Sequence, residues 1–135
     1  MNTSAAETLY AQVDIESQVL NASPYQLVQI LFDGALSALK RAVIYIEQNN
    51  IQQKSHAISK AIAIINEGLN NGVDLEHGGE IAENISLLYD YMIRPLLYAN
   101  LYNDVDRIQQ VIKLLTDSAD TWTQLNDPAI KFNEQ

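Results

Sequence analysis

The sequence predicts an all-α fold, an antiparallel up-down four-helix bundle with an N-terminal arm or short extra helix. Apolar residues recur every three or four positions in four segments of the 135-residue chain, the spacing of one helix face. Polar links containing Asn, Asp and Gly separate these segments, and no segment shows strand-like alternation. We therefore expect an arm over residues 1–22, the bundle over 23–126 and a flexible tail over 127–135.

The first predicted helix begins after Ser23, a suitable N-cap, with Pro24 at a position where its missing N–H costs nothing. Asn49 and Asn50 end it. Two neighbouring apolar rows favour a helix that is packed on two sides. One row contains Leu27, Leu31, Gly34, Ala38, Ala42 and Tyr45, and the other contains Val28, Phe32, Ala35, Leu39 and Ile46.

The second predicted helix spans about residues 51–69 and also carries two rows. The row expected to face the core contains Ile51, Ile58, Ile62, Ile65 and Leu69. Its neighbour consists mostly of small residues, namely Ala57, Ala61, Ile64 and Gly68. Asn71 and Gly72 then suit a left-handed helix end, so the following residues are expected to form a loop.

The third predicted helix runs from Glu80 through Pro95. Its expected core stripe contains Ile81, Ile85, Leu88, Met92, Leu96 and Ala99. Because this stripe continues in phase on both sides of the proline, we expect a kink there and not a break. Three large apolar residues, Leu87, Tyr91 and Tyr98, lie off the stripe.

The fourth predicted helix follows a turn at Asn103 and Asp104, with Asp104 as its N-cap. Seven apolar residues at helical spacing form its core stripe: Val105, Ile108, Val111, Ile112, Leu115, Ala119 and Trp122. The pair Asp127-Pro128 marks the start of the tail.

The composition excludes several classes of protein. A formal net charge of −9 with only eight Lys and Arg residues gives no basic face, which disfavours nucleic acids and anionic membranes as partners. The chain has no cysteine, so disulfides and thiolate zinc sites are excluded. We see no secretory signal and no apolar run of the ~20 residues that span a bilayer. A cytoplasmic location without membrane insertion is expected.

The sequence predicts no catalytic residues, no metal site and no cofactor. A di-metal bundle needs inward-facing Glu-x-x-His pairs, whereas Glu76 and His77 are adjacent and in a predicted loop. A histidine phosphotransfer domain is a sharper alternative, because His56 lies on a helix one turn before Lys60. The segment "HAISKA" nevertheless lacks the glycine that would open a phosphorylation face, so this alternative is disfavoured.

Apolar residues beyond the core are the main functional signal. The small row of the second helix would let another helix approach closely, and tyrosine offers a large contact area at low entropic cost. The candidate binding residues are therefore Ala57, Ala61, Ile64, Gly68, Leu87, Tyr91 and Tyr98. An alternative, which the pattern leaves open, is that the N-terminal arm and the tail cover these rows.

Five segments together resemble the flagellin-specific export chaperones, the FliS family. They are "LYAQVDIES" with Tyr10, "ASPYQLVQILFDGAL" at 22–36, "SKAIAIINEGL" at 59–69, "GGEIAENISLLYDYM" at 78–92 with Arg94, and "AN" at 99–100. They occur in the family's order from residue 9 to about residue 122. Pro95 departs from the family pattern, where a basic or polar residue is expected.

The resemblance implies a cytosolic helical bundle without catalysis, which binds the C-terminal segment of flagellin and prevents premature polymerisation. It also implies contact with the cytosolic domain of the flagellar export gate. The N-terminal arm in this family can lie over part of the client surface, so Tyr10 is added to the candidate binding residues as the arm's anchor. A helical adaptor with another client stays open as an alternative, and a homodimer is possible.

Overall fold

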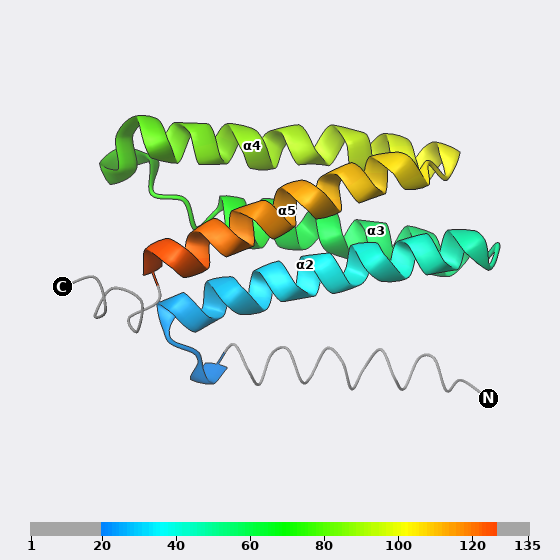
Figure 1. The fold of residues 1–135 in the computed structure, drawn as a ribbon, viewed down its shortest axis with the longest axis horizontal. Coiled ribbons are helices and arrows are strands. Elements are labelled where there is room, and N and C mark those ends of the chain that lie inside the picture. The colour runs from blue at the N-terminus through cyan, green and yellow to red at the C-terminus, as the bar shows by residue number, and fades with distance from the viewer. Residues whose placement is uncertain (1–19, 127–135) are drawn as a thin grey trace.

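A computed structural model describes residues 20–126, except the side chains of residues 75–77 and 126, and these residues contain four helices. They are α2 (Pro24–Glu47), α3 (Ile51–Ala63) continuing as the π-helical η1 (Ile64–Asn70), α4 (Leu75–Tyr102) and α5 (Val105–Asn126). Successive helices run in opposite directions (Figure 1). The described residues contain no strand, so the predicted all-α bundle is confirmed. Most of the predicted arm and the whole tail lie outside these residues.

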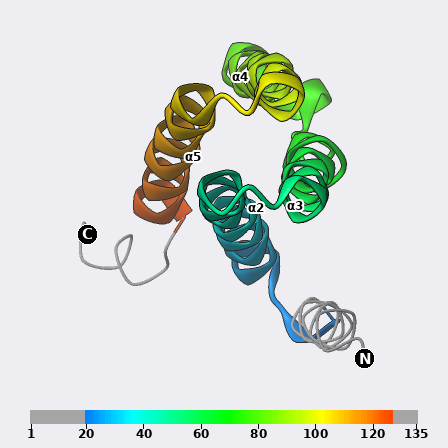
Figure 2. The ribbon, with the colours of Figure 1, turned by 90° about the vertical axis from the view of Figure 1, so that its right-hand side faces the viewer.

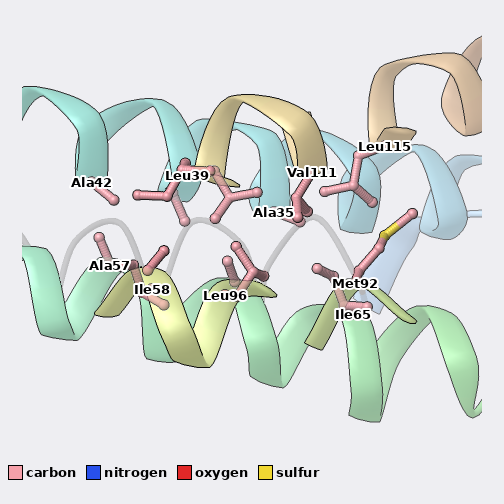
Figure 3. Close-up of a cluster of buried hydrophobic side chains, with 14 of the residues drawn as sticks. Ala35, Leu39, Ala42, Ala57, Ile58, Ile65, Met92, Leu96, Val111 and Leu115 are labelled. Atoms are coloured by element: carbon pink, nitrogen blue, oxygen red, sulfur yellow. The ribbon is translucent and has the colours of Figure 1, made fainter. Parts of the chain in front are cut away.

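The helices surround one apolar core. α2 and α4 each pack against α3, η1 and α5, and the end-on view shows the four rods arranged around a shared interior (Figure 2). Side chains from every helix point into that interior (Figure 3). The largest fully buried ones are Leu39, Ile58, Ile65, Met92, Leu96, Ile108, Val111 and Leu115.

Two predicted helix starts are confirmed by their capping contacts. The Ser23 Oγ accepts a hydrogen bond from the Gln26 N–H at 3.2 Å, and the Ser23 N–H donates to the Gln26 Oε1 at 3.1 Å. These reciprocal bonds form a capping box, with Pro24 at the first helical position. The Asp104 carboxylate likewise accepts from the Arg107 N–H at 3.3 Å. Each cap satisfies a backbone donor that the helix itself leaves unpaired.

The α4 helix continues through Pro95, as predicted. Its only residue with non-helical backbone angles is Gly79, at φ 58° and ψ −139°. An L-residue rarely adopts this conformation, so glycine marks the boundary between a short turn and the long helix. The regular part of α4 therefore begins at Glu80, where the sequence placed it.

The expected core stripe is wrong at the start of α4. Ile81 is 74% exposed and Ile85 is 39% exposed, whereas Ala82 and Tyr89 are buried. The first half of α4 is thus rotated about its axis relative to the expected orientation, and two hydrogen bonds account for this. The Asn70 side chain at the end of η1 accepts a hydrogen bond from the Ser86 hydroxyl and donates one to the Asp90 carboxylate. They hold the first half of α4 against η1. Both isoleucines are exposed, and the ribbons of α4 and α5 diverge towards this end of the bundle (Figure 1).

The start of the second helix also differs from the expectation. Ile51, predicted in the core row, is 44% exposed because it is the first residue of α3 at the end of the bundle. The buried position one turn later belongs to Lys54. Of the other members of that row, Ile58, Ile65 and Leu69 are buried, and Ile62 is partly buried against the core.

Candidate functional site

Among the residues that the structure describes, the largest group of exposed apolar side chains lies on the side of α4 that points away from the core. Its members are between 40% and 73% exposed, and we call them the outer α4 face: Leu87, Tyr91, Tyr98, Leu101 and Tyr102. Residues separated by four, seven or eleven positions lie on one side of a helix. The buried Met92 and Leu96 occupy the opposite side. One helix therefore contributes a core stripe and a second, solvent-facing apolar stripe.

Aromatic contacts order one end of this face. The rings of Tyr98 and Tyr102 are tilted against each other with centroids 4.6 Å apart. The Arg107 guanidinium lies 3.7 Å from the centroid of the Tyr98 ring, a cation–π contact. Its Nε is also 3.2 Å from the Asp104 carboxylate. Two helices thus hold the tyrosine ring in place without covering it.

The structure brings together the predicted residues of α4 and separates them from those of α3. Leu87, Tyr91 and Tyr98 all belong to the outer α4 face. Ala57 and Ala61, in contrast, are members of the core, and Ala57 faces Ala42 of α2 in Figure 3. The predicted residues therefore do not form one continuous exposed surface.

The two remaining α3-side candidates also pack against α2. Ile64 is partly buried, and its Cδ1 would lie 3.3 Å from a Cβ built on Gly34. A Cβ on Gly68 would meet the Leu31 side chain at 3.0 Å. The small row does permit close approach of a helix, but that helix is α2 of the same chain. Tyr10 lies outside the described residues.

Sequence reasoning missed part of the outer α4 face. Leu101 and Tyr102 continue the spacing of Tyr91 and Tyr98. The same periodicity, followed to the end of the helix, would have identified them. Arg107 is different, because its position over a ring of another helix depends on how α4 and α5 pack. No sequence spacing signals that contact.

The exposed isoleucines at the start of α4 form a second, smaller apolar group. Ile81 and Ile85 are exposed and lie one turn apart on the same side of α4. They do not belong to the outer α4 face, because their helical phase is that of the core stripe. The described residues therefore expose apolar groups on two sides of α4.

The described residues offer little for catalysis. Among the side chains that the structure describes, no group of three or more His, Asp or Glu residues is placed to hold a metal ion. His56 is exposed on α3, and Lys60 one turn later is partly buried. Burial, with a smaller contribution from Arg41, lowers the pKa of Lys60. Over the same residues no helix has the length and hydropathy required for a membrane span.

This fold and this surface define a class: small helical proteins that carry a solvent-exposed apolar face on one helix. Comparison with known proteins narrows the class to a family. The sequence model of the protein family described as flagellar protein FliS matches residues 6–129 of this chain. The chain therefore belongs to the FliS family, whose members are chaperones and not enzymes.

Three relatives show the range of similarity. The flagellar secretion chaperone FliS of Salmonella typhimurium is 52% identical over 134 residues, which cover 99% of this chain and 98% of the relative. The FliS of Escherichia coli is 48% identical over 115 residues, 85% of each chain. The FliS of Bacillus subtilis is 33% identical over 109 residues, covering 81% of this chain and 80% of the relative. Membership of a chaperone family leaves the phosphotransfer alternative without support.

Proposed function

We propose that this protein is a cytosolic chaperone that binds the C-terminal segment of flagellin, prevents its premature polymerisation and supports its delivery to the flagellar export apparatus. Similarity to flagellar secretion chaperones over nearly the whole chain supports an export role. The observation that carries the binding proposal is the outer α4 face, with five large apolar side chains exposed on one helix. Such a face takes an amphipathic helix as its partner.

The energetics of this proposal are feasible. A disordered segment that folds on binding loses ~2–5 kcal/mol in ordering. Burial of apolar surface gains about 25 cal/mol per Å², so several hundred Å² offset that loss. The five side chains of the outer α4 face, together with Ile81 and Ile85, provide contact on two sides of one helix. A client that wraps around α4 would reach both groups.

The net charge of −9 supports the same proposal, because it helps to keep the client-free protein in solution. A protein that exposes large apolar side chains needs charge elsewhere to remain soluble while no client is bound. The acidity also suits a protein that works away from nucleic acid and anionic membrane surfaces. We further propose that the chaperone, once loaded, contacts the cytosolic domain of the export gate.

Of the residues predicted from sequence, we retain Leu87, Tyr91 and Tyr98 as client-binding residues and add Leu101 and Tyr102. Ala57 and Ala61 are left out because their side chains are buried against α2. For Tyr10 we keep the proposal that the N-terminal arm competes with the client. The variant Tyr10→Ala should then change client affinity while the thermal unfolding of the bundle stays the same.

The experiment is a calorimetric titration with a peptide from a flagellin C-terminus, followed by far-UV circular dichroism. Binding with a gain of helix beyond the sum of the free components supports the proposal. Tyr91→Glu should abolish binding, and Gln52→Glu, at an exposed site on α3, should leave it unchanged. Absence of heat and of induced helix with the wild-type chain would show that the client is a different protein.

A further inference from the structure

The basic residues of the described helices gather in one half of the bundle. Along the sequence they are scattered over four helices, but successive helices run in opposite directions, so the end of one lies beside the start of the next (Figure 1). The hydrogen bond from Lys54 near the start of α3 to Asn100 near the end of α4 marks this shared end. The half with the α2–α3 and α4–α5 turns holds Lys40, Arg41, Lys54, Lys60, Arg94, Arg107 and Lys113.

Most acidic residues of the described helices lie in the other half. The rings of Tyr25 and Trp122 stack with centroids 6.2 Å apart, so the start of α2 and the end of α5 share this end. The acidic half holds Asp33, Glu67, Asp74, Glu80, Glu83, Asp90, Asp117 and Asp120. Among the described residues, the acids of the basic half are Glu47, Asp104 and Asp106. The net charge of −9 thus conceals two halves of opposite sign.

Three cations of the basic half, together with one isoleucine, form what we call the α2 basic patch: Lys40, Arg41, Ile44 and Lys60. Ile44 follows Lys40 by four positions and Arg41 by three, so these exposed residues share one side of α2. Ile44 is 48% exposed. The Arg41 guanidinium donates a hydrogen bond to the Ser37 Oγ at 2.8 Å, which orders it on the helix surface.

Lys60 completes the patch from α3. Ala42 and Ala57 face each other where α2 and α3 pack (Figure 3). Arg41 directly precedes Ala42, and Lys60 follows Ala57 by one turn, so in this antiparallel pair both cations lie on the same side of the contact. Burial, with a smaller contribution from the Arg41 charge, lowers the pKa of Lys60, as expected when two cations are neighbours.

No acidic group of the described residues is paired with the patch, because none of its three cations makes an ion pair there. The acids in the same helical phase lie seven positions away, Asp33 and Glu47 from Lys40 and Glu67 from Lys60. Seven residues span about 10 Å of helix, which exceeds the Debye length of ~8 Å at physiological salt. The positive charge of the patch is therefore available to an approaching group.

The neighbouring charge on α5 is also a cation. Leu36 and Thr116 line one cavity between α2 and α5, and Lys40 and Lys113 each lie one turn beyond them in the same direction. We leave Lys113 out of the patch because Asp117 follows it by one turn. The α5 side thus adds no net negative charge next to Lys40.

The patch and the outer α4 face lie on different sides of the molecule. In the end-on view α2 and α4 lie diagonally across the interior, and the exposed side chains of each helix point away from that interior (Figure 2). A partner on the patch would therefore leave the outer α4 face accessible.

We propose that the α2 basic patch is a second docking surface, which binds an acidic segment of a partner protein. Charge complementarity selects the sign of the partner, and Ile44 adds an apolar contact that a protein segment can match. The patch covers only about two turns of α2. A long polyanion or an anionic membrane would also lie against the acidic half and be repelled, whereas a short acidic segment contacts the patch alone.

The first test is a fluorescence anisotropy titration at low salt with a short labelled peptide of alternating Glu and Leu. A Gln/Leu peptide of the same length is the neutral control, and it should bind at least about tenfold more weakly. Arg41→Glu should weaken binding of the Glu/Leu peptide about fivefold or more, because an exposed charge contact becomes a repulsion. Lys40→Glu provides a second, independent reversal with the same expected result.

The matched control is Arg94→Glu, which gives the same net charge but changes an exposed arginine of α4. Its Kd should stay within about twofold of wild type. Equal weakening by Arg41→Glu and Arg94→Glu would show that only net charge matters, and absence of binding by the wild type would also overturn the proposal. The Kd should further increase several-fold between about 0.01 M and 0.15 M salt, and a constant Kd would exclude a charge contact.

Other occupants give different results. If single-stranded DNA or vesicles of phosphatidylserine and phosphatidylcholine bind with the same loss in Arg41→Glu, and the Glu/Leu peptide does not bind, the assignment to a protein partner is wrong. Sedimentation at low salt tests a second copy of the chain. A dimer that Arg41→Glu dissociates would place the acidic half of another copy on the patch and would overturn the proposal.

A competition experiment separates this inference from the proposed function. In the presence of a saturating flagellin C-terminal peptide, the Glu/Leu peptide should bind with an unchanged Kd. Mutual exclusion would show that the two surfaces overlap and would overturn a separate docking surface. If the flagellin peptide does not bind, the proposed function fails, and the titration with the Glu/Leu peptide still decides the inference.

Discussion

The Lys54 ammonium donates a hydrogen bond to the backbone carbonyl of Asn100 over 2.6 Å, although the lysine side chain is only 3% exposed. Asn100 belongs to the last turn of α4, whose carbonyls have no partner within the helix. The neighbouring Ser55 hydroxyl donates to the Asn100 side chain at 3.1 Å. The start of α3 thus caps the end of α4, and burial lowers the pKa of Lys54.

Lys54→Met should lower the free energy of unfolding by about 1–2 kcal/mol, because the Asn100 carbonyl loses a charged donor. Relief of the lysine's desolvation offsets part of the loss. Urea denaturation followed by circular dichroism measures the difference. The control Lys40→Met removes an exposed lysine from α2 and should stay within 0.5 kcal/mol of wild type. Equal or greater stability of Lys54→Met would show that desolvation outweighs the hydrogen bond.

The buried Tyr89 predicts a dependence of stability on alkaline pH. Burial raises its pKa to about 12 from the ordinary value of 10.0, so the folded chain holds the phenolic proton more tightly than the unfolded chain. This stabilisation is complete below pH 10 and is lost as the pH rises through 12. Between pH 8 and pH 11 the wild type should therefore lose roughly 1 kcal/mol more than Tyr89→Phe in denaturant titrations. Identical losses in the two proteins would contradict the assignment.

The close approach of η1 to α2 predicts that Gly68 resists enlargement. A Cβ at this position already meets the Leu31 side chain at 3.0 Å, so a larger side chain must displace Leu31. Gly68→Leu should cost about 1–3 kcal/mol in the free energy of unfolding. Gly72→Leu is the matched control, because Gly72 is exposed and its Cβ would make only ordinary contacts at 3.5 Å. The thermal unfolding curves of Gly68→Leu and Gly72→Leu should separate clearly. Coincident curves would refute the close packing of Gly68 against Leu31.

Ile64 and Tyr91 should respond differently to the same substitution. Ile64 packs against the core cluster, so Ile64→Asp buries a charge and should destabilise the chain by more than about 2 kcal/mol. Tyr91 is 64% exposed, and Tyr91→Asp should stay within about 0.5 kcal/mol while client binding is lost. Thermal unfolding and peptide titration of both variants test the contrast. A stable Ile64→Asp variant would return this residue to the candidate binding surface.

Much of the fold could be predicted from the sequence because local signals agree with the tertiary packing. The Ser23 and Asp104 caps begin their helices where expected. In α5 the predicted stripe is confirmed, with Ile108, Val111 and Leu115 fully buried. A helix that packs along its whole length buries one apolar stripe, so its periodicity identifies the buried side.

The candidate site could be predicted only in part. Three of its residues, Leu87, Tyr91 and Tyr98, were found because they lie off the core stripe of their own helix. For α3 the same reasoning failed, since the small row that contains Ala57 turned out to contact α2. Small side chains allow close approach of any helix, so their spacing does not distinguish a partner from a neighbour in the same chain.

By itself the sequence determined the helix starts capped by Ser23 and Asp104 and which residues share a face, because both follow from backbone geometry and local capping. The left-handed helix end expected at Asn71 and Gly72 was wrong, since Asn71 is right-handed and α4 begins already at Leu75. The tertiary structure decided which faces are covered. It left Ile81 exposed and buried Lys54, and it placed Arg107 over Tyr98. These outcomes depend on the rotation and divergence of whole helices, which are set by contacts between residues far apart in the chain.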